Sequence, residues 1–168
     1  MVVEYLERDH AAFRSAPDHL ARAERALLAH GLSGATTFRA EFDRERLRSL
    51  IGGDAFATLF TDVSEHGRDP SRYDTYEGDL DQERIALLSA LLAAEDLGGR
   101  ESPHNYIRSI RLLDGSGRTL LRIGDHNTFY VFDLPPDERP ALIEDLQDIG
   151  LPGDVIKPVD IELDRLEP

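Results

Sequence analysis

The stretch of residues 105–134 constrains the fold of this 168-residue chain more strongly than any other part. It alternates apolar and polar side chains, and two glycine-containing segments, 114–117 and 124–127, interrupt the alternation. A period of two is typical of strands that bury one face, and short Gly/Asp/Asn segments are typical of hairpin turns. These features predict a three-stranded antiparallel meander.

The first turn predicts how the strands of this meander pair. Gly115-Ser116 suits a two-residue turn, which places Ile110 opposite Leu121 and collects the apolar side chains of both strands on one face. The face of the third strand stays open at this point. A two-residue turn before it directs Tyr130 toward the core, whereas a three-residue turn directs Phe129 there.

Helical and strand-like patterns predict the elements around the meander. Residues 1–31 form a helical N-terminal segment that ends at Gly31, because apolar residues recur at helical spacing up to that glycine. Further helices are expected at residues 43–51, 54–63, 80–97 and 137–149, a strand at 36–42, and an edge strand within 155–166. Residues 1–168 then form one α+β domain in which helices cover mainly one face of an antiparallel sheet.

The composition of residues 64–78 predicts a long irregular loop, because this segment is rich in Gly, Pro, Asp and Ser and shows no period. The loop carries Tyr73 and Tyr76. Tyrosine is enriched among the residues that dominate binding energy at interfaces, so both side chains are candidate anchors for a protein partner. The alternative is that they pack on their own domain.

The chain has 33 acidic and 19 basic residues, which gives it a net charge of −14. Such a charge repels phosphate backbones and anionic lipids, so we expect binding to neither nucleic acid nor membranes. Two interpretations of the acidity stay open: a solvated coat that favours solubility, or a surface that faces a basic partner. The meander arginines Arg111, Arg118 and Arg122 are expected on its polar face, paired with carboxylates.

Several classes of protein and of active site are excluded by what the sequence lacks. No apolar run reaches the ~20 residues of a membrane span, and the first residues do not resemble a signal peptide, so we expect a cytoplasmic location. Without cysteine there is no disulfide, thiolate metal site or cysteine nucleophile. The chain also lacks the phosphate-binding, dinucleotide-binding, zinc-protease and serine-hydrolase motifs, and no motif predicts a cofactor.

One group of polar residues is expected to converge at an end of the meander. The start of its first strand and the turn before its third strand lie at the same end of the sheet, which brings together His104, Asn105, Asp125, His126 and Asn127. Imidazole and carboxylate groups bind Zn²⁺, Mn²⁺ or Fe²⁺ where thiolates are absent, so this end is a candidate site for a metal or a small polar ligand. The alternative is that these residue types are present because turns favour them.

These observations favour a non-enzymatic binding protein that engages a protein partner, with a basic partner as the electrostatic match. Its role would be that of a chaperone, an adaptor or an immunity protein. The alternative is a metal-dependent or small-ligand-binding enzyme that uses the polar end of the meander, around His104, Asp125 and His126. Formation of a homodimer stays open.

A metal at the polar end makes a direct prediction. Because both imidazoles would bond one ion, Zn²⁺ binding measured by titration calorimetry should be lost in His126→Ala and retained in His10→Ala. Wild-type heats no larger than those of His126→Ala would remove the metal hypothesis.

Overall fold

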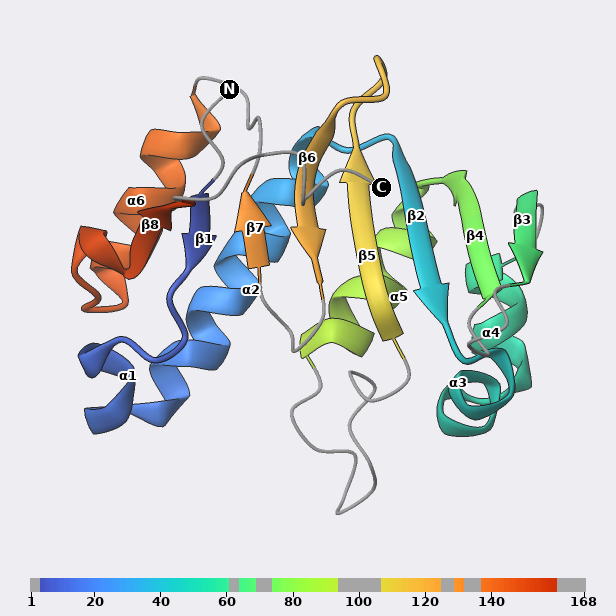
Figure 1. Ribbon diagram of the computed structural model, residues 1–168, viewed down its shortest axis with the longest axis horizontal. Coiled ribbons are helices and arrows are strands. Elements are labelled where there is room, and N and C mark those ends of the chain that lie inside the picture. Colours follow the sequence, from blue (N-terminus) through green and yellow to red (C-terminus); the bar gives the residue numbers. More distant parts are fainter. Residues whose placement is uncertain are drawn as a thin grey trace.

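The computed structural model describes residues 4–60, 64–68, 74–93, 107–124, 129–131 and 137–159. These residues form an eight-stranded antiparallel sheet in the order β3-β4-β2-β5-β6-β7-β1-β8. The helices pack on one face of the sheet, and Figure 1 shows α2 and α5 behind the strands. The predicted α+β class, with an antiparallel sheet and helices mainly on one face, is confirmed.

The elements have the following bounds. The strands are β1 (Glu4–Leu6), β2 (Thr37–Phe42), β3 (Ser64–Arg68), β4 (Asp74–Asp79), β5 (Ile107–Leu113), β6 (Thr119–Ile123), β7 (Phe129–Val131) and β8 (Ile156–Pro158). The helices are α1 (Ala11–Ser15), α2 (Pro17–Gly34), α3 (Arg44–Ile51), α4 (Gly53–Phe60), α5 (Gln82–Ala93), α6 (Glu138–Asp148) and the 3₁₀ helix η3 (Gly153–Val155). Strands β5, β6 and β7 are consecutive neighbours, as a meander requires.

The turn between β5 and β6 is longer than the predicted two-residue turn. The N–H of Asp114 donates to the carbonyl of Arg118 at 2.9 Å, and Gly117 adopts a φ of 84°. This geometry is a three-residue hairpin loop with glycine in the left-handed position. The carboxylate of Asp114 holds the loop by accepting hydrogen bonds from the hydroxyl of Ser116 and from the N–H groups of Arg118 and Ser116. These bonds, that of the Ser116 hydroxyl first, lower the pKa of Asp114 well below its usual range.

The longer turn and a β-bulge between Leu112 and Leu113 together change the register of the meander without changing its faces. Ile110 pairs with Ile123 rather than with Leu121, a shift of two residues. Since side chains alternate with a period of two, this shift leaves the same residues on the core face, and these three side chains are at most 3% exposed. Phe129 of β7 is the register partner of Ile123, which is the position that the longer of the two alternative turns predicts for it.

Helix α2 continues past the predicted stop at Gly31 and ends at Gly34. Gly31 serves instead as the point of closest approach between the helix and the sheet. A β-carbon at this position would lie 2.9 Å from the β-carbon of Leu121 and 3.2 Å from Cδ1 of Leu112. The glycine is therefore required by packing against β5 and β6, which is a tertiary reason that the local sequence pattern does not reveal.

Two segments form strands where the sequence predicts other structure. Residues 4–6 form β1, not part of a helix, because they pair with both β7 and β8 and bury Leu6 to 1% exposure. Residues 64–68 and 74–79 form β3 and β4, not an irregular loop. Strand β4 pairs along the whole of β2, so long-range hydrogen bonding compensates for its weak strand pattern.

The C-terminal edge strand is present but earlier and shorter than expected. Strand β8 covers Ile156–Pro158 and pairs with β1 at the border of the sheet. Pro158 is the last residue of the strand, whereas the sequence pattern predicts it at the start. The rest of the predicted strand, residues 160–166, lies outside the described residues.

Substitution of Gly31 tests the close approach of α2. Although alanine favours a helix by about 1 kcal/mol over glycine, we expect Gly31→Ala to lower the free energy of unfolding, because overpacking costs about 1 to 3 kcal/mol and a β-carbon cannot rotate away. Gly53→Ala is the matched control: nothing lies within 4 Å of a β-carbon there, so it should be neutral or stabilising. Equal stability of the two variants in urea denaturation would contradict the close approach.

Candidate binding surfaces

The polar end of the meander lies outside the part of the chain that the structure describes. This holds for His104, Asn105, Asp125, His126 and Asn127, and their convergence stays a prediction. Within the described ranges, no three His, Cys, Asp or Glu side chains are grouped so that they could hold a metal ion. Among the described residues, the candidate binding surfaces therefore lie elsewhere.

Of the two candidate tyrosine anchors, Tyr73 lies outside the described residues and Tyr76 is part of the core. Tyr76 is 6% exposed and stacks on Phe42 with a centroid distance of 4.8 Å. Phe60 lies 5.2 Å from the same ring. Tyr76 thus packs on its own domain, which is the alternative that the sequence left open, and it cannot also anchor a partner from this position.

Arginines gather on the sheet face opposite to the helices. Arg39 of β2 pairs in register with Arg111 of β5, and Arg111 pairs with Arg122 of β6. Three adjacent strands thus place like charges directly opposite one another, and Glu77 of β4, the other register partner of Arg39, places a carboxylate at one end of the row. Arg118, expected on the same face, instead binds Asp114 in the turn at 2.8 Å. The sheet therefore carries a row of basic residues, defined here as Arg39, Arg111 and Arg122.

Helix α6 carries the opposite charge. Its inner face buries Leu142 and Leu146, which are 1% and 0% exposed. Its exposed acidic side chains, together with the residue before it, are Asp137, Glu144, Asp145 and Asp148. Its one basic residue, Arg139, is bound by both carboxylate oxygens of Glu4. We call Asp137, Glu144, Asp145 and Asp148 the acidic face of α6.

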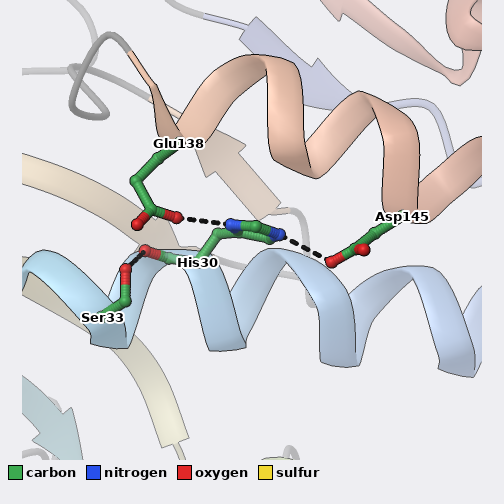
Figure 2. A network of polar contacts seen from close by, with 4 residues as sticks. All are labelled: His30, Ser33, Glu138 and Asp145. Atoms are coloured by element: carbon green, nitrogen blue, oxygen red, sulfur yellow. Dashed lines mark hydrogen bonds and ion pairs between the residues drawn. The ribbon is translucent and has the colours of Figure 1, made fainter.

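A histidine joins α2 to this acidic helix. His30 Nδ1 lies 2.6 Å from Glu138 Oε2, and His30 Nε2 lies 2.8 Å from Asp145 Oδ2 (Figure 2). The imidazole side chain is 12% exposed, whereas that of Asp145 is 57% exposed. Figure 2 shows the ring between the two helices, with one carboxylate at each of its nitrogens. With both nitrogens occupied, His30 in this arrangement can neither ligate a metal nor act as a general base.

The surroundings of His30 shift its protonation equilibrium. Burial lowers the pKa of His30, but the hydrogen bonds to Glu138 and Asp145 and the charges of both carboxylates together outweigh burial and raise the pKa above its ordinary value of 6.5. The hydrogen bond from His30 lowers the pKa of Glu138. The arrangement thus favours an imidazolium between two carboxylates.

Sequence reasoning did not find this network, because its members lie 108 and 115 residues apart. One partial signal was available. Glu138 and Asp145 are seven residues apart, so two helical turns place both on the same side of α6. Nothing local indicates that His30 faces that side, since this follows from the docking of α6 on α2.

Comparisons with known proteins identify no relative of this chain. No protein-family model, curated protein or solved structure matches the chain. Among the described residues, no helix is both long and apolar enough to cross a bilayer.

Proposed function

We propose that this protein is a non-enzymatic binding protein and that its partner is a protein with a basic contact surface. The acidic face of α6 is the proposed contact region. The observation that carries the proposal is the uneven distribution of charge over a chain with a net charge of −14.

This distribution favours a binding surface over a uniform soluble coat. A coat that serves only solubility has no need to separate the two signs of charge. Here exposed carboxylates gather on and just before one helix, whereas exposed arginines lie on other helices, such as Arg22 and Arg25 of α2, and the basic row lies on the far face of the sheet. Such a local concentration of carboxylates produces a directional field, which steers a partner of opposite charge to one side of the molecule.

The acidic face also rests on a supported element. Helix α6 is held from below by Leu142 and Leu146 and laterally by the His30 contacts to Glu138 and Asp145. A surface whose backbone is already ordered loses less conformational entropy on binding than a loop would. The support under α6 therefore suits a preformed contact region.

Electrostatic steering predicts a defined salt dependence. For a partner captured with the immobilised protein and then purified, association should slow several-fold between about 50 and 500 mM salt, while dissociation changes much less, because the Debye length falls from roughly 14 to 4 Å. Surface plasmon resonance measures both rates. An association rate that ignores salt, or a partner that is itself acidic, would contradict the proposal.

Matched charge reversals locate the contact. The double variant Glu144→Lys/Asp148→Lys changes the acidic face of α6, whereas Glu45→Lys/Asp54→Lys makes the same change in net charge on α3 and α4. We expect the α6 variant to slow association at least ten-fold more than the control variant, since steering depends on where the charge lies. Equal effects of the two variants would show that only net charge matters and would remove α6 from the proposal.

A further inference from the structure

His30 is the one described residue whose side chain connects α2 to α6 through two ring nitrogens at once. The two contacts hold α6 at two points, since Glu138 is its first residue and Asp145 lies about two turns later. The remaining described anchorage of the helix includes the buried side chains of Leu142 and Leu146. Glu138 and Asp145 lie on either side of Leu142 along α6, and Leu146 directly follows Asp145.

The two contacts can form together only in one protonation state of the His30 ring. An ionised carboxylate only accepts hydrogen bonds, so each ring nitrogen of His30 must donate. The imidazolium has two N–H donors, whereas neutral imidazole has one. In the neutral ring, one nitrogen lone pair would face a carboxylate oxygen at 2.6 or 2.8 Å, which is repulsive. Only the protonated ring can hold both carboxylates of α6.

We propose that His30 is a proton-operated latch between α2 and α6: the protonated ring holds Glu138 and Asp145 together, and loss of its proton releases one of them. The latch is an intramolecular contact and does not depend on the proposed partner. It loosens one end of α6 without undocking the helix, because the buried leucines remain in place.

The direction of the pH dependence follows from the pKa shifts. The pKa of His30 is raised on folding, so its contribution to stability is fully present below 6.5 and is lost as the pH rises through the folded-state pKa. The pKa of Glu138 is lowered on folding, so its contribution is present above 4.5 and is lost as the pH falls through its folded-state pKa. The latch is therefore strongest between about 4.5 and 6.5 and weakens toward alkaline pH.

The groups that face the ring define which variants can test it. From α6, the two carboxylates of Glu138 and Asp145 face the ring and supply the charges that act on it. From its own helix, the nearby polar side chain is Ser33, whose hydroxyl donates to the backbone carbonyl of His30 at 3.0 Å and does not titrate in this range. Asp145→Asn and Glu138→Gln remove one charge each and keep the side-chain size.

The first test is an NMR titration of the intact protein. The His30 ring signal, assigned by its loss in His30→Gln, should titrate with a midpoint above 6.5 in the wild-type chain, and the midpoint should fall in both Asp145→Asn and Glu138→Gln. This measurement needs no partner, so it separates failure of the latch from failure of the proposed function. A wild-type midpoint at or below 6.5, or no change in either variant, would overturn the latch.

The second test asks whether the proton controls α6. Amide protection factors in α6, corrected for intrinsic exchange, should fall several-fold as the pH rises through the His30 midpoint in the wild-type chain. They should be independent of pH in His30→Gln, whose amide donates but does not titrate. His19→Gln, on the same helix, is the control and should behave as the wild type does. Protection in α6 that does not respond to pH in the wild-type chain would refute the control of this helix by His30.

Discussion

The contact between α2 and the meander is the interaction on which the rest of the structure depends. Gly31 lets the helix axis approach the sheet so closely that a β-carbon at this position would lie 2.9 Å from the β-carbon of Leu121. The buried side chains of Leu27, Leu28 and Leu32 extend this contact, and the helix lies against β5, β6 and β7. Because α5 and α6 both pack against α2, their heights over the sheet follow from this approach.

The strand order converts this packing into a separation of charge. Strands β2, β5 and β6 are neighbours in the sheet although β2 is far from them in the sequence, and their in-register arginines form the basic row on the face without helices. The acidic face of α6 belongs to the helix layer. A chain that is acidic in total thus has a basic row on the sheet and a cluster of exposed carboxylates on one helix, and the proposed function rests on that cluster.

The candidate site illustrates how far sequence reasoning reaches. The net charge of the chain and the acidity of residues 137–148 can be read directly from the sequence, so a basic partner could be predicted from the sequence alone. Tyr76 could not be assigned, because its burial depends on stacking against Phe42 of a distant strand. The partnership of His30 with two carboxylates could not be assigned either, since it is created by helix docking.

The sequence by itself determined the α+β class, the meander, strand β2 and which side chains of the first two meander strands face the core, because alternation with a period of two is a local property. It also determined the net charge. Only the tertiary structure decided the strand character of β1, β3 and β4, the register of the β5–β6 hairpin, the role of Gly31 and the bridge at His30. The hairpin register depends on the hydrogen bonds of the turn at Asp114 and on the bulge beside it. The others depend on hydrogen bonds or close contacts between segments far apart in the chain, and such pairings leave no periodic trace in the residues that make them.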